Sequence, residues 1–147
     1  MLQEQSLRPL HDVDRMLQYA RLLGEEIRRN GAQPVLFATW ARRSDPALQD
    51  KLDEAYQRVA ADLNAQVAPV GQVWRAALNA DGALRVFDED GSHPSAAGSY
   101  LAACVIHLTL QPVVSHCPVV PVGGLPVEGA ESIAGIARRA LRSPSAR

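Results

Sequence analysis

Two residues that could act together in acid–base chemistry lie in one short polar segment, DEDGSHPS at 88–95. Asp90 stands three positions before His93, with Gly91 between them to allow a turn. A carboxylate at that spacing on a loop can fold back and accept the proton on the imidazole Nδ1. That hydrogen bond fixes the tautomer and leaves Nε2 free to act as a base. The Pro-Ser pair that follows is typical of the start of a helix, so we expect the base just ahead of one.

The same segment has two other interpretations. An aspartate three positions before a histidine occurs often by chance, so the segment could be a polar surface loop with a solvated histidine. Asp88, Asp90 and Ser92 also alternate as in a calcium-binding loop. Such a loop requires a bidentate glutamate at its twelfth position, which is Ser99 here, so we do not favour a calcium site.

The surrounding sequence predicts helices that alternate with short buried strands. Apolar residues recur at three- and four-residue steps through the helical segments, whereas two strand segments are short continuous apolar runs between turn residues. This alternation favours right-handed crossovers and a parallel sheet. We expect helices over 12–30, 45–63, 71–80, 95–110 and 132–141, strands over 34–40 and 66–70, and a brief extended piece over 84–87.

The segment 90–103, DGSHPSAAGSYLAA, resembles the final sequence block of the SGNH, or GDSL-type, hydrolases. In that block a D-x-x-H-P segment supplies the catalytic aspartate and histidine, and a G-x-Y-L-A helix follows. The runs VLFATWA at 35–41 and VAPVGQVW at 67–74 look like the family's fourth and fifth strands, and LQEQS at 2–6 is similar to the end of its third. The resemblance runs from about Leu2 to His107. It implies an α/β fold, a flavodoxin-like three-layer sandwich with a parallel sheet, here lacking its first strands.

The resemblance implies acyl ester hydrolysis by a serine nucleophile, with Asp90 as the orienting carboxylate and His93 as the general base. The family binds the oxyanion with two backbone N–H groups and an asparagine side chain. Gln3 lies where that asparagine is expected and carries the same amide donor, the alternative being an ordinary polar residue at a strand end. The resemblance implies no metal and no cofactor. The implied substrates are small-molecule, carbohydrate or lipid esters.

The sequence departs from the family at the nucleophile. It contains no G-D-S block, no glycine block and no G-x-N-D pattern. Ser6 could be considered instead, but it would lie at a strand end on the wrong side of the block order. Two hypotheses therefore stand: an SGNH-type hydrolase whose nucleophile segment is missing, or a truncated or non-catalytic binding or structural module of the same fold.

The composition is that of a soluble globular protein. The chain has 147 residues, 47% of them hydrophobic and 21% charged, with a formal net charge of −1. That charge argues against a nucleic-acid partner, and no apolar run approaches the roughly 20 residues that span a membrane. Residues 1–15 lack the order of a signal peptide, so we expect a cytoplasmic protein if Met1 is the true start.

We expect a partial hydrolase domain over 1–111, and over 112–147 a Pro/Gly-rich segment and a helix that pack on it or trail from it.

Several other residues have less specific interpretations. Cys104, in an apolar helix, is expected to be a buried reduced thiol, and a disulfide with Cys117 is the less favoured alternative. Trp40 and Trp74 are expected in the core or a pocket wall, and His107 as a core or boundary histidine with its hydrogen bonds satisfied. His11 and His116 form no recognisable metal site.

The missing strands also predict a feature of the surface. Because the chain begins at the end of the third strand, we expect an open sheet edge beside 35–39. Leu36 and Phe37 should then lack cover on at least one face. An open apolar edge favours strand addition, so we expect self-association through it.

Overall fold

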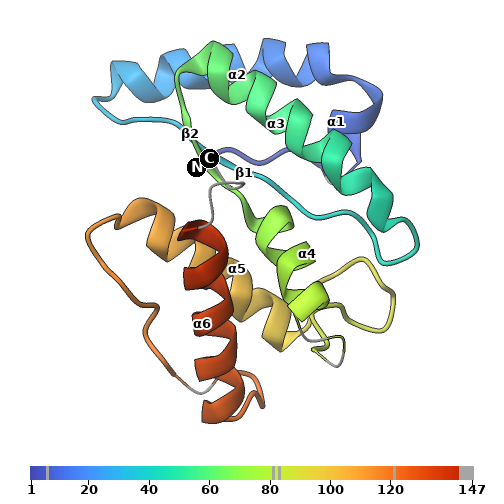
Figure 1. The fold of residues 1–147 in the computed structure, drawn as a ribbon. Helices are drawn as coiled ribbons and strands as arrows, with labels where there is room; N and C mark the ends of the chain where they lie inside the picture. The colour runs from blue at the N-terminus through green and yellow to red at the C-terminus, as the bar shows by residue number, and fades with distance from the viewer. Residues whose placement is uncertain (6, 81, 83, 121, 143–147) are drawn as a thin grey trace.

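The structure is a computed structural model that describes residues 1–5, 7–80, 82, 84–120 and 122–142 (Figure 1). Each expected helix is present, whereas the four-residue helix α1 was not expected, and both strands are shorter than expected. The elements are α1 Arg8–His11, α2 Val13–Arg29, β1 Val35–Phe37, the 3₁₀ turn η1 Pro46–Leu48, α3 Gln49–Leu63, β2 Gln66–Ala68, α4 Val70–Ala80, α5 Ala96–Leu110 and α6 Val127–Arg142.

The sheet has β1 at its centre. β1 and β2 pair in parallel, with Leu36 opposite Val67. On the other side of β1, the Leu2 N–H donates to the Val35 carbonyl at 2.8 Å, and the Leu2 carbonyl accepts the Phe37 N–H at 2.8 Å. Leu2 therefore forms a parallel bridge to Leu36, and β1 has a neighbour on each side.

This pairing makes the expectation of an open edge beside 35–39 wrong. Leu2 occupies that edge, and Leu36 is only 1% exposed because it packs between the helices of one face. Phe37 is half-buried against the core of the opposite face. Within the described residues, no strand pairs with the outer side of Leu2. The unpaired edge of the sheet is therefore at Leu2 and not at β1.

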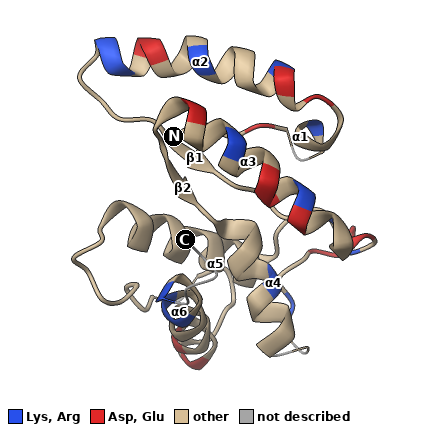
Figure 2. Ribbon diagram, turned by 45° about the horizontal axis from the view of Figure 1, so that its top comes forward, with Lys and Arg blue, Asp and Glu red and all other residues tan. Residues whose placement is uncertain are grey.

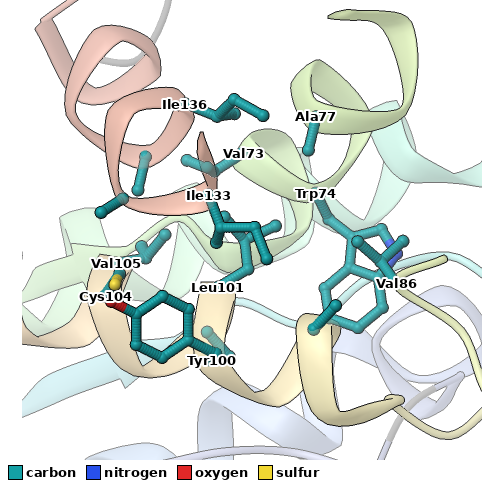
Figure 3. Close-up of a cluster of buried hydrophobic side chains, with 14 of the residues drawn as sticks. Val73, Trp74, Ala77, Val86, Tyr100, Leu101, Cys104, Val105, Ile133 and Ile136 are labelled. Atoms are coloured by element: carbon teal, nitrogen blue, oxygen red, sulfur yellow. The ribbon is translucent and has the colours of Figure 1, made fainter. Parts of the chain in front are cut away.

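Helices cover both faces of this small sheet (Figure 1). Successive strand residues point to opposite faces, so Leu36 belongs to the core under α2 and α3 while Phe37 packs against the core formed by α4, α5 and α6. The second core is the larger, and Figure 3 shows how it is filled. Its fully buried side chains include Val73, Trp74, Val86, Leu101, Val105 and Ile133.

Asp, Glu, Lys and Arg residues occur on α2, α3, α4 and α6 but not on α5. α2 and α3 expose charged side chains and are joined by ion pairs, Arg21 to Asp62 at 2.5 Å and Arg58 to Asp14 at 2.6 Å. α5 carries no Asp, Glu, Lys or Arg and is covered by α4 and α6 (Figure 2). The exposed pairs contribute little to stability, so apolar burial holds the helices in place.

Cys104 and Cys117 form a disulfide, which corrects the expectation of a reduced thiol at Cys104. The expected burial of Cys104 is confirmed, since its exposed fraction is 0%. The chain after α5 turns back along that helix and brings the two Cα atoms to 5.3 Å. No local pattern marks that return, which is why the sequence favoured the thiol.

None of the helices in the described part of the chain is long and apolar enough to cross a membrane.

Candidate active site

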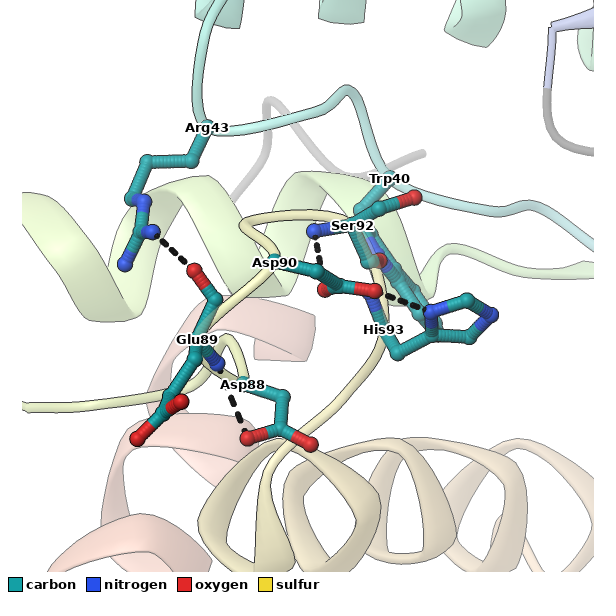
Figure 4. Close-up of polar contacts among 7 residues, drawn as sticks. All are labelled: Trp40, Arg43, Asp88, Glu89, Asp90, Ser92 and His93. Carbon is teal, nitrogen blue, oxygen red and sulfur yellow. Dashed lines mark hydrogen bonds and ion pairs between the residues drawn. The ribbon is translucent and has the colours of Figure 1, made fainter.

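Asp90 and His93 are joined as their spacing predicts. His93 Nδ1 is hydrogen-bonded to Asp90 Oδ2 (Figure 4). The other carboxylate oxygen, Oδ1, accepts the backbone N–H groups of Ser92 at 2.8 Å and His93 at 2.9 Å. Both oxygens of Asp90 are therefore engaged, and the carboxylate cannot rotate away from the ring without losing three hydrogen bonds.

The backbone of the loop closes on itself around this pair. The Asp88 N–H donates to the His93 carbonyl at 2.9 Å, and the Gly91 N–H donates to the Asp88 carbonyl at 3.1 Å. Gly91 has a φ of +66°, in the left-handed region that favours glycine. Glycine at this position therefore makes the fold-back of Asp90 possible, as expected from the sequence.

Helix α5 fixes the far end of the loop. Ser95 is its N-cap: its Oγ accepts the Gly98 N–H at 3.2 Å and donates to the Arg85 carbonyl at 2.5 Å. A Cβ at Gly98 would lie 2.1 Å from the Val86 carbonyl oxygen, so only glycine lets the helix approach this closely. His93 consequently stands just ahead of α5, as predicted.

The segment after β1 provides a second anchor, which sequence reasoning missed. The Trp40 indole N–H donates to the Ser92 carbonyl at 2.9 Å, and the Arg43 backbone N–H donates to the Gly91 carbonyl at 2.9 Å. Trp40 in turn stacks on Trp74 at 4.1 Å between ring centroids, with the planes 9° apart. The expectation that both tryptophans line the core or a pocket is confirmed, but no sequence pattern marks Ser92 as a partner of Trp40.

The electrostatics of the pair suit a base and its orienting carboxylate. The hydrogen bond from His93, and then the two backbone N–H groups, hold the pKa of Asp90 well below its usual range. The carboxylate is therefore ionised at neutral pH and can stabilise a protonated ring. The His93 side chain is 78% exposed, and Figure 4 shows its second ring nitrogen pointing away from the loop.

The structure leaves the nucleophile and the oxyanion donor unassigned. Within the described residues, no hydroxyl or thiol group is hydrogen-bonded to His93 Nε2. Gln3 is exposed and follows Leu2 at the carboxyl end of the parallel sheet, but no hydrogen bond in the described part of the chain joins it to the Asp90–His93 pair. Ser6 lies outside the described residues.

His107 differs from its expected state. The side chain is half-buried on α5, but its Nε2 is buried without a hydrogen-bond partner among the described residues. The expectation that the hydrogen bonds of His107 are satisfied was therefore wrong for Nε2.

A cavity of about 790 Å³ between α3, α4 and α6 has charged and apolar side chains in its lining but lacks the Asp90–His93 pair. Arg75 binds Asp50 at 2.6 Å and lies 3.8 Å from Asp53. Asp53 also accepts the Gln49 side-chain amide at 2.8 Å, and burial raises the pKa of Asp53. Asp50, Asp53 and Arg75 therefore satisfy one another, and Glu54 and Arg139 also line the cavity.

Comparisons with known proteins support the fold. No family model matches the sequence, and no curated protein matches it. A solved structure does match: it is described as "a putative SGNH hydrolase" from Slackia heliotrinireducens, with 33% sequence identity and a TM-score of 0.62. The match covers 74% of this chain and 62% of that chain, so this chain spans less than two thirds of the neighbour's length. The helix-rich α/β structure with its parallel sheet is thus SGNH-like.

Proposed function

We propose that this chain is the Asp-His part of an SGNH-type serine ester hydrolase. The observation that carries the proposal is the contact between Asp90 and His93, held by three hydrogen bonds on a loop at the start of α5. The neighbour's description, "a putative SGNH hydrolase", supports the same reaction class. We also propose that Leu2, β1 and β2 correspond to adjacent strands of a flavodoxin-like three-layer sandwich, since helices cover both faces.

In the proposed reaction, His93 Nε2 removes the proton of a serine hydroxyl as the serine oxygen attacks the ester carbonyl. Ionised Asp90 holds the ring through Nδ1 and stabilises the imidazolium that forms. The imidazolium then gives its proton to the departing alcohol, which leaves an acyl-enzyme. Water deprotonated by His93 releases the acid and restores the serine. Gln3 is proposed to donate its amide N–H to the oxyanion. Proposed substrates are small-molecule, carbohydrate or lipid esters.

The second candidate is a non-catalytic binding or structural module of the same fold. The absence of any G-D-S block in the sequence favours it. The DNA upstream of the Met1 codon separates the two candidates. A G-D-S segment there, in frame or shifted by a frame, would indicate a truncated enzyme. Intergenic sequence with its own ribosome-binding site would indicate a stand-alone module.

The enzymatic proposal is tested by supplying the nucleophile. The chain alone should hydrolyse p-nitrophenyl acetate no faster than an imidazole-bearing peptide, because within the described residues no hydroxyl or thiol group is hydrogen-bonded to His93 Nε2. Co-expression with a G-D-S-bearing N-terminal segment of an SGNH hydrolase should give a complex that turns over the ester. A serine-directed phosphonate should titrate that turnover, and His93→Ala should abolish it. A complex that co-elutes but is inactive, or keeps its full rate in His93→Ala, contradicts the proposal. If the chain alone turned over the ester as fast as the complex, the nucleophile would be a serine within this chain.

A further inference from the structure

A second cavity, of about 240 Å³, lies between the segment after β1 and helix α4. Its apolar lining includes Trp74, Leu78 and Phe87, and Arg42 and Arg43 also line it. Neither Asp90 nor His93 belongs to its lining. Its volume is below the roughly 300–1,000 Å³ of sites for drug-sized ligands, so it suits a molecule built on a single ring.

Arg42 and Arg43 bring positive charge that no carboxylate neutralises within the described residues. The Arg43 guanidinium donates to the Glu89 backbone carbonyl at 2.8 Å, and Figure 4 shows the Glu89 carboxylate turned the other way. Arg42 is exposed and forms no ion pair in the described part of the chain. Arg75, which also lines the cavity, is by contrast bound to Asp50 at 2.6 Å. Two guanidinium groups without a carboxylate partner, beside an apolar wall, suit a carboxylate ligand.

Trp74 provides a separate observation. It is 1% exposed, stacks on Trp40, and meets Phe87 edge-on at 5.3 Å between ring centroids. Its indole N–H is buried and has no hydrogen-bond acceptor among the described residues. A buried donor without a partner is unusual in folded proteins.

We propose that this cavity binds a small aromatic carboxylate. The ring lies against Trp74 and Phe87, and the carboxylate is bound by Arg42 and Arg43. The aromatic wall favours a planar ring, and the two arginines favour an anion over a neutral molecule. The site is distinct from the Asp90–His93 pair, and the proposal holds whether or not the chain takes part in ester hydrolysis.

Tryptophan fluorescence provides a direct test, because the sequence contains two tryptophans and both lie in this stack. Titration of the intact chain with benzoate should give a saturable change in emission. Benzamide keeps the ring without the charge, and acetate keeps the charge without the ring. Benzamide and acetate should each bind about tenfold more weakly than benzoate, because benzamide loses the charge-assisted hydrogen bonds and acetate loses the ring contact. No saturable change with benzoate, or equal binding of benzamide, would overturn the proposal.

Substitutions locate the site. Arg42→Gln and Arg43→Gln should each weaken benzoate binding by about tenfold. Arg138→Gln alters an exposed arginine of α6 outside the cavity and should bind benzoate like the parent chain. Because Arg42 is exposed, its replacement tests the proposal even if Arg43→Gln disturbs the fold. Unchanged affinity in Arg42→Gln, with a parent-like circular dichroism spectrum, would show that benzoate binds elsewhere.

Discussion

Trp40 donates its indole N–H to the backbone carbonyl of Ser92 at 2.9 Å, across 52 positions of sequence. The bond ties the segment that leaves β1 to the loop that carries His93. Trp40→Phe keeps an aromatic ring against Trp74 but removes the donor, and the Ser92 carbonyl is only partly buried, so water can replace part of the interaction. We expect the free energy of unfolding to fall by about 1 kcal/mol, measured by urea denaturation. A loss indistinguishable from zero would mean that this contact does not hold the loop.

The depressed pKa of Asp90 predicts a pH-dependent contribution to stability. Because the folded-state pKa lies below the unfolded value of about 3.9, this contribution is present above that value and is lost as pH falls through the folded pKa. Asp90→Asn removes the titrating group. The difference in unfolding free energy between the parent and Asp90→Asn should shrink as pH falls below about 4. Because both proteins contain the other acidic groups, such as Asp62, the contributions of those groups to the pH dependence cancel in this difference. A difference that is unchanged in acid would show that Asp90 gains nothing from its partners in the folded state.

The Cys104–Cys117 disulfide predicts a loss of stability on its removal. It closes a short loop, with a sequence separation of 13 residues. The chain-entropy model assigns such a loop about 3 kcal/mol. Replacing both cysteines by alanine should lower the unfolding free energy by about that amount. Thiol labelling of the unfolded parent should detect no free thiol without reductant and both thiols after reduction. Two labelled thiols without reductant would contradict the disulfide.

The disulfide also bears on where the protein resides. Disulfides form and persist mainly in oxidising compartments. The thiol labelling above, performed on protein trapped directly from cells, shows whether the pair is oxidised where the protein resides.

Because Leu2 occupies the edge beside 35–39, we now propose self-association through the outer side of Leu2 instead. Tyr19, Leu22 and Leu23 of α2 are each about half exposed, at 51%, 57% and 51%. Tyr19 and Leu23 line a small cavity with Leu2, so apolar surface continues from the helix to the unpaired edge. We expect light scattering to show dimers or larger species, and Leu23→Glu to shift them toward monomer because a charge cannot be buried there. Glu25→Gln, on the exposed surface of the same helix, serves as the control. A monodisperse parent monomer with a sharp cooperative melt would rule out this role for the edge.

What could be predicted from the sequence was local. The period of apolar residues predicted α2 and α3, and Ser95 marked the start of α5 because its side chain caps the helix. The Asp90–His93 contact joins residues three apart across a glycine, so the local spacing allowed it, and the resemblance of 90–103 to the SGNH block favoured it. Contacts between distant segments were missed: Leu2 beside β1, Cys117 beside Cys104, and Trp40 on Ser92. Helix α1 was missed because four residues contain too little periodicity to recognise.

The tautomer of His93 tests the central claim most directly. Nitrogen chemical shifts of the ¹⁵N-labelled His93 ring report which nitrogen carries the proton when the ring is neutral. A free imidazole side chain favours the proton on Nε2, whereas a base oriented by Asp90 must carry it on Nδ1. We predict the Nδ1–H form in the parent chain and a shift toward the Nε2–H form in Asp90→Asn. A parent ring that is mainly Nε2–H, or one that Asp90→Asn leaves unchanged, would contradict the assignment of Asp90 and His93 as an orienting carboxylate and its base.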